Sequence, residues 1–78
     1  MSENIYGAVI GVLGPLVGKP VAEICIRSAA IKAGRPSEAL TVADLDTVLA
    51  EIQTSMKPFT SAAVLDGAIV EIRSRVEA

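Results

Sequence analysis

Few side chains in this 78-residue sequence could support catalysis. Cys25 is the single cysteine and there is no histidine, so a thiol nucleophile would lack an imidazole base and a metal site would lack its commonest ligands. Asp44 and Asp46 stand two residues apart, so on a helix their carboxylates point in different directions. We interpret these two and Asp66 as caps or solvated surface, and expect no enzymatic activity, no cofactor and no metal.

Cys25 keeps a second interpretation. A buried free cysteine usually behaves as a small hydrophobe, and this is the interpretation we favour. A redox or nucleophilic role would need positive surroundings that lower the pKa of the thiol. Arg27 lies too close in the sequence to share its helical face.

The run "YGAVIGVLGPLVGKP" carries glycines at positions 7, 11, 14 and 18. A phosphate-binding loop needs a lysine followed by Ser or Thr, but Lys19 is followed by Pro20. A membrane-spanning helix needs about 20 apolar residues, whereas the uncharged stretch 4–18 is shorter and contains Pro15. What remains is G-x-x-x-G spacing, typical of helices in close contact, unless Gly14-Pro15 breaks the helix and makes that spacing partly accidental.

Composition limits the other classes of function. The hydrophobic fraction is 51% and the net charge is −2, so residues 1–78 make one domain with more apolar material than a small monomer easily hides. The cations are not clustered, and one Tyr and one Phe give no stacking platform, so no nucleic-acid partner is expected. The acidic start "MSEN" is unlike a signal peptide, and the free cysteine indicates a reducing compartment. We therefore expect a cytoplasmic protein.

Apolar residues recur at heptad spacing, which predicts helices with one apolar stripe each. We expect helices at about 3–13, 15–33, 42–56 and 60–76, and hence an all-α bundle of three to four helices with short connections, completed by self-association. The four stripes are Ile5, Val9, Val12 and Leu16; Val17, Val21, Ile24, Ser28 and Ile31; Leu45, Leu49, Ile52 and Met56; and Leu65, Ile69, Ile72 and Val76.

Local signals place the helix ends. Thr41 and Asp44 have the spacing of a capping box, Lys57-Pro58 ends the third helix, and Thr60 or Ser61 can cap the fourth. Gly34 after Lys32 predicts a left-handed end to the second helix. The start of that helix stays open: if it begins at Pro15, Pro20 would kink it, and if it begins near Gly18, Pro20 is tolerated in the first turn.

The first helix has two faces to bury, large residues on one side and glycines on the other. One of these faces is our candidate interface, with Gly7, Gly11, Val9, Val12 and Leu16 as the residues involved. Two ion pairs four residues apart, Glu23 with Arg27 and Glu71 with Arg75, are expected to mark solvated sides of helices.

The stretches "VLGPLVGKPVAEICIRSAAIKAG" and "LTVADLDTVLAEIQTSMKPF" together resemble a small helical domain of uncharacterised function found at the ends of bacterial signalling proteins. Gly14, Pro15, Leu16 and the run 27–33 carry the likeness, while Pro20 and the neutral section 23–26 depart from it. The resemblance implies an association module without catalytic residues.

The function expected from the sequence is a non-catalytic helical module for oligomerisation or protein interaction, in bacterial signalling or regulation. Its partner would be a second copy or a helix of another protein, docked through residues at heptad spacing. The alternative is a peripheral membrane protein that binds lipid through residues 4–18. A single neighbouring cation, Lys19, speaks against it, because interfacial helices normally carry a cationic face.

Overall fold

A computed structural model describes residues 4–77 of the chain. It contains four α-helices joined by short connections, α1 (Ile5–Val17), α2 (Lys19–Ala33), α3 (Leu45–Met56) and α4 (Ala62–Glu77), with two short 3-10 turns at Ser37–Ala39 and Val42–Asp44. No strand occurs among residues 4–77. The expected all-α bundle is therefore confirmed.

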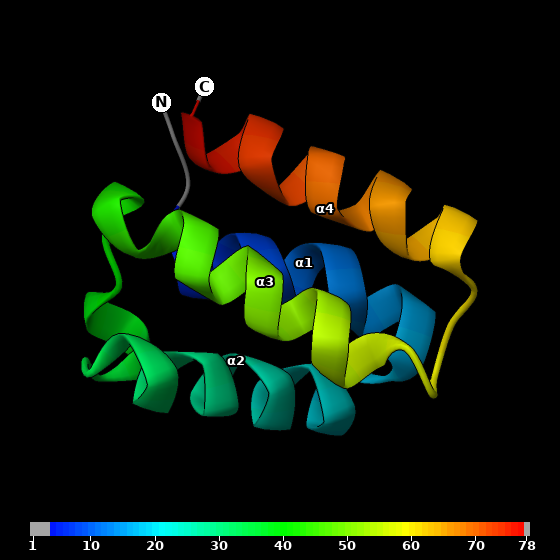
Figure 1. The fold of residues 1–78 in the computed structure, drawn as a ribbon, viewed down its shortest axis with the longest axis horizontal. Coiled ribbons are helices and arrows are strands. Elements are labelled where there is room, and N and C mark those ends of the chain that lie inside the picture. Colours follow the sequence, from blue (N-terminus) through cyan, green and yellow to red (C-terminus); the bar gives the residue numbers. More distant parts are fainter. Residues whose placement is uncertain (1–3, 78) are drawn as a thin grey trace.

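The helices run alternately in opposite directions, and α4 returns alongside α1 (Figure 1). Each helix packs against the next one along the chain, most closely at the α1–α2 and α2–α3 contacts, and α1 also packs against α4. The accessible surface of 4370 Å² is close to the roughly 4500 Å² typical of a monomer of this mass. The fold thus closes around its core within one chain.

The core consists of apolar side chains from all four helices. The whole predicted stripe of α3 is buried, and α4 buries Leu65, Ile72 and Val76 of its stripe. The buried residues are Ile5, Ala8, Val9, Leu13, Ala22, Cys25, Ile26, Ala29, Ala30, Leu40, Leu45, Val48, Leu49, Ile52, Met56, Leu65, Ala68, Ile72 and Val76.

The expected break at Gly14-Pro15 is wrong, because α1 continues through both residues to Val17. A proline disfavours helix at the preceding residue partly through a clash with its Cβ, and Gly14 has none. Pro15 also lies in the last turn, where only a short part of the helix follows it. The Gly-Pro sequence therefore lies near the end of a helix rather than at the start of one.

The chain turns at Gly18 instead. Gly18 has φ +92°, a left-handed conformation that favours glycine, and α2 begins at the next residue. Pro20 falls in the first turn of α2, where a helix needs no amide donor. Of the two alternatives for the start of this helix, the one near Gly18 is confirmed.

Three other helix ends follow their local signals. Gly34 ends α2 in the left-handed conformation with φ +76°. The Thr41 N–H donates to Asp44 Oδ2 at 3.0 Å before α3. Before α4, the Val64 N–H donates to Ser61 Oγ at 3.3 Å, so Ser61 is the residue that caps this helix. The capping signals in the sequence were sound.

The stripe predicted for the second helix is wrong. Alanines and Ile26 form the buried face of α2, whereas Ile24 is 68% exposed and Ile31 is 80% exposed. The reason is packing distance: Ala22, Ala29 and Ala30 let the backbones of α1 and α3 approach α2 closely, which two isoleucines on that face would prevent. The bulkier residues are left on the outside.

Candidate interaction surface

A row of residues runs along the outer face of α2, with Ile24, Ser28 and Ile31 exposed and Val21 half-buried against the core. Four residues, Val21, Ile24, Ser28 and Ile31, recur at intervals of three and four and are called here the α2 stripe. At 100° per residue, Ile26 lies on the opposite side of the helix from Ile24 and is fully buried. In Figure 1, α1 and α3 lie on one side of α2 and no helix covers its other side.

An apolar groove adjoins the α2 stripe, between α2 and the end of α3. Its volume is about 210 Å³, and it is lined by Val21, Ile24, Cys25, Ser28, Ser55, Met56 and Phe59. Phe59, in the turn after α3, is 57% exposed at the groove. Three residues of the α2 stripe, Val21, Ile24 and Ser28, thus line the groove, and Ile31 lies about one turn beyond it.

Cys25 lies at the groove and is 2% exposed. Burial raises the pKa of its thiol to about 11, and the negative charge of Glu51 adds to this effect. The thiol is therefore protonated at neutral pH, and a protonated thiol is a poor nucleophile. This agrees with the interpretation of Cys25 as a small buried hydrophobe.

Charged residues flank the α2 stripe without pairing to each other. The expected ion pair between Glu23 and Arg27 is absent, and within residues 4–77 neither side chain forms another one. The corresponding pair on α4 does form, with Arg75 Nε 3.5 Å from Glu71 Oε1. The flank of the α2 stripe thus offers one acidic and one basic group to an outside partner.

The large candidate residues of α1 point mostly into the protein. Val9 is fully buried, Val12 is half-buried against the core and Leu16 is 47% exposed. In this fold Val9 has no surface to offer another chain. Leu16 alone of the three keeps a large exposed area.

The candidate glycines of α1 are engaged within the chain. The Gly7 N–H donates to Asn4 Oδ1 at 2.6 Å, which caps the start of the helix. A Cβ placed on Gly11 would lie 2.9 Å from Nη1 of Arg75, so the Arg75 side chain of α4 lies over this glycine. The five candidate residues therefore do not form one open face.

Two of the three aspartates considered as candidates, Asp44 and Asp46, hold elements together. Arg35 Nε lies 2.9 Å from Asp44 Oδ2, which ties the end of α2 to the start of α3. The Thr41 backbone N–H, followed by the Thr41 hydroxyl and Arg35, stabilises the charged form and lowers the pKa of Asp44 below its usual value. This carboxylate is a structural cap.

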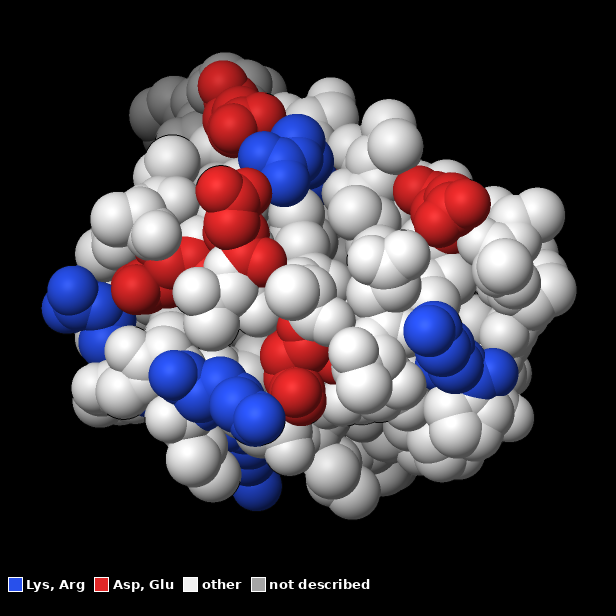
Figure 2. Space-filling model, in the orientation of Figure 1, with Lys and Arg blue, Asp and Glu red and all other residues white. Residues whose placement is uncertain are grey.

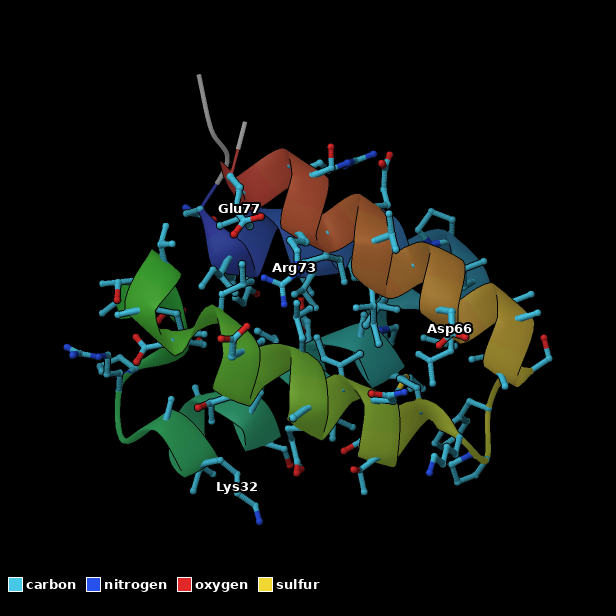
Figure 3. The ribbon with its side chains drawn as sticks, turned by 45° about the horizontal axis from the view of Figure 1, so that its top comes forward. Lys32, Asp66, Arg73 and Glu77 are labelled. Atoms are coloured by element: carbon cyan, nitrogen blue, oxygen red, sulfur yellow. The ribbon has the colours of Figure 1, made fainter. Side chains whose placement is uncertain are left out.

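Asp46 is likewise paired. Arg73 Nη2 lies 2.9 Å from Asp46 Oδ1, and Arg73 Nη1 lies 3.5 Å from Glu77 Oε2. Figure 3 shows Arg73 and Glu77 towards one end of α4, with Asp66 towards the other end of that helix. The carboxylates of Asp46 and Asp66 are therefore not gathered at a common site.

Residues 4–77 hold no group of three or more His, Cys, Asp or Glu arranged to bind a metal ion. In the same range, every helix is too short or too polar to traverse a lipid bilayer. Figure 2 shows acidic and basic residues interspersed on one face of the molecule, with uncharged surface between them.

Comparison of the chain with models of known protein families, with curated proteins and with solved structures gives no match. The resemblance to a domain of bacterial signalling proteins therefore stays a prediction. The α2 stripe and the groove remain the features of the described residues that most clearly offer a binding surface.

Proposed function

We propose that this protein is a non-catalytic helical module that self-associates through the outer face of α2. The observation that carries the proposal is the apolar surface of Ile24 and Phe59, each more than half exposed beside an apolar groove, with Ile31 exposed farther along the same face of α2. Contiguous apolar surface of this kind typically marks an interaction site. The mode of binding is a helix laid into a groove, with anchors at heptad spacing.

The energetics favour occupation of this surface. Burying a large aliphatic or aromatic side chain completely is worth about 1.5–3 kcal/mol, and these three residues are still mostly exposed. Their combined burial would offset a substantial part of the association cost, estimated at about 4–15 kcal/mol. A reversible complex of modest affinity is the expected result.

The core gives independent support. The face of α2 that packs inside consists largely of alanines with Ile26, while Ile24 and Ile31 remain outside. An isoleucine row is a costly surface for a protein that stays alone, and it is useful for one that associates.

A concentration series by light scattering after size exclusion tests this function. We expect the mean mass to rise from that of one chain towards that of two as the concentration increases through the micromolar range. A mass that stays at one chain up to high micromolar concentration would refute self-association.

The setting that we propose for this module is bacterial signalling or regulation in the cytoplasm. Its support is the sequence resemblance carried by Gly14, Pro15, Leu16 and the run 27–33. Fusion of residues 1–78 to a monomeric reporter tests whether the module brings attached domains together. A reporter that stays monomeric would count against such a role.

Binding of residues 4–18 to a membrane surface is a second hypothesis with less support. The side chains that such a helix would insert include Ile5, Val9 and Leu13, which are all buried in the core. Flotation with anionic vesicles separates the hypotheses. We expect the folded protein to stay out of the floated fraction, and recovery with the vesicles would favour the membrane hypothesis.

A further inference from the structure

We infer that two copies of this chain pair through α2 helices packed antiparallel, related by a two-fold axis at the height of Ile26. This inference rests on the proposed self-association and names its surface and geometry. Ile26 is the midpoint of α2 (Lys19–Ala33), so the antiparallel arrangement overlaps the two helices along their whole length. A two-fold axis makes the interface self-complementary, because the same residues serve both copies.

The spacing of the α2 stripe suits this arrangement. Antiparallel pairing about Ile26 sets Ile24 opposite Ser28 of the second copy, so that a large side chain meets a small one. It also sets Ile31, which is 80% exposed, opposite Val21 of the second copy, at one wall of the apolar groove. Each copy thus supplies both a projecting side chain and a groove to receive one.

The flanking charges favour the antiparallel direction. Glu23 and Arg27 lie on the same flank of α2, one turn apart, and antiparallel helices bring like flanks together. Along the helix axis, Glu23 then lies about 3 Å, or two residues, from Arg27 of the second copy. Two symmetric ion pairs can form between groups that are unpaired within residues 4–77.

The parallel direction loses these ion pairs. Parallel helices bring opposite flanks together, so the flank with Glu23 and Arg27 would face the flank of the second copy that carries Lys32. Like-charge juxtaposition across an interface is unfavourable. The antiparallel direction sets two contacts between Glu23 and Arg27 against one between Arg27 and Arg27 of the second copy, which also lie about 3 Å apart along the axis.

The area available fits a weak dimer. With roughly 200 Å² for the surface of a large apolar side chain, the exposed fractions of Ile24, Ile31 and Phe59 leave roughly 400 Å² per copy. Together with the polar flanks, two copies would bury on the order of 1,000 Å² in total, at the lower limit for a specific interface. We expect a dissociation constant in the micromolar range.

Disulfide trapping tests the geometry. In a Cys25→Ala background, Ile24→Cys and Ser28→Cys are made in separate full-length chains that carry different tags. Mild oxidation of the mixture should yield a mixed disulfide dimer several times more abundant than either homodimer. A Val70→Cys pair is the control for random collision, because Val70 is as exposed as Ile24 (68%) but lies on α4.

Charge exchange gives a second, independent readout. Glu23→Arg and Arg27→Glu should each weaken the dimer about tenfold by placing like charges together. The doubly exchanged chain should return to within a few-fold of the wild type, because it restores opposite charges across the interface. A double variant that is as weak as the singles would overturn the predicted pairing.

The outcomes separate this inference from the proposed function. A wild-type chain that stays monomeric would refute both the proposed self-association and this interface. A wild-type dimer that traps no mixed disulfide, or traps mainly the Ser28→Cys homodimer, leaves self-association standing and overturns the antiparallel α2 interface.

Discussion

Helices α1 and α2 both carry apolar residues on two sides, but their surroundings differ. One side of α1 lies in the core with Val9, and the Arg75 side chain of α4 reaches over Gly11 on another side, so that Leu16 is the one large side chain of this helix that is exposed. One side of α2 is covered, and the side with Ile24 and Ile31 is not. The difference teaches that small residues, and not the bulkiest ones, decided which face of α2 turned inward.

The largest expected effect comes from the buried side of α1. Leu13 is fully buried, so Leu13→Ala should lower the free energy of unfolding by about 2–5 kcal/mol. Leu16→Ala, three residues away at a position that is 47% exposed, is the matched control and should cost less than half as much. Urea unfolding followed by circular dichroism measures both. Equal losses would mean that α1 is not oriented as described.

The next effect distinguishes the two sides of α2. Ala29 is fully buried, so Ala29→Leu should overpack the contacts of α2 and cost about 1–3 kcal/mol. Ser28→Leu places the same new side chain on the outer face and should leave the melting temperature nearly unchanged. If Ser28→Leu proved the more destabilising of the two, our assignment of the inner face would be wrong.

A smaller effect concerns the link between α2 and α3. The pKa of Asp44 is lowered in the folded protein, so its contribution to stability is present above the unfolded pKa, about 3.9. That contribution is lost as the pH falls through the folded pKa. The stability of Asp44→Asn should therefore depend less on pH below about 4 than that of the wild type.

The exposed Asp66→Asn on α4 is the control for this pH dependence. Unfolding curves at several pH values between neutrality and acid measure all three proteins. If the Asp44→Asn and Asp66→Asn profiles both matched the wild type, Asp44 would not be the coupled cap that the geometry describes.

The smallest effect is expected at Gly11. An added Cβ would meet only the end of the Arg75 side chain, which can move, and alanine is favoured over glycine in a helix by about 1 kcal/mol. Gly11→Ala should therefore stay within about 1 kcal/mol of the wild type and leave association intact. Loss of the oligomer in Gly11→Ala would instead indicate an interface on the glycine side of α1.

The sequence predicted most of the fold, because several signals there were local. The stripe of α3, from Leu45 to Met56, combined apolar spacing with a capping box before it and Pro58 after it. The end of α2 was indicated by Gly34 and the residues next to it. Such signals depend on residues within a few positions of one another, which a sequence displays directly.

The candidate surface could not be predicted in the same way. Heptad spacing selected Ile24 and Ile31 for the core, because they continue the four-three spacing of Val17, Val21 and Ser28. The structure instead buries Ala22, Ala29 and Ala30. Which face of α2 turns inward depends on how α1 and α3 pack against it, and therefore on residues of those two helices as well. One signal was present in the sequence: this helix, like the first one, carries apolar residues on two faces.

The most direct test of the central claim is the mass of three proteins measured by sedimentation at high micromolar concentration. Ile24→Glu and Val70→Glu place the same charge at positions that are both 68% exposed, one on the α2 stripe and one on α4. We predict that the wild type and Val70→Glu sediment as dimers and that Ile24→Glu sediments as a folded monomer with an unchanged melting temperature. A dimeric Ile24→Glu, or loss of the dimer in Val70→Glu alone, would contradict the assignment of the interface to α2.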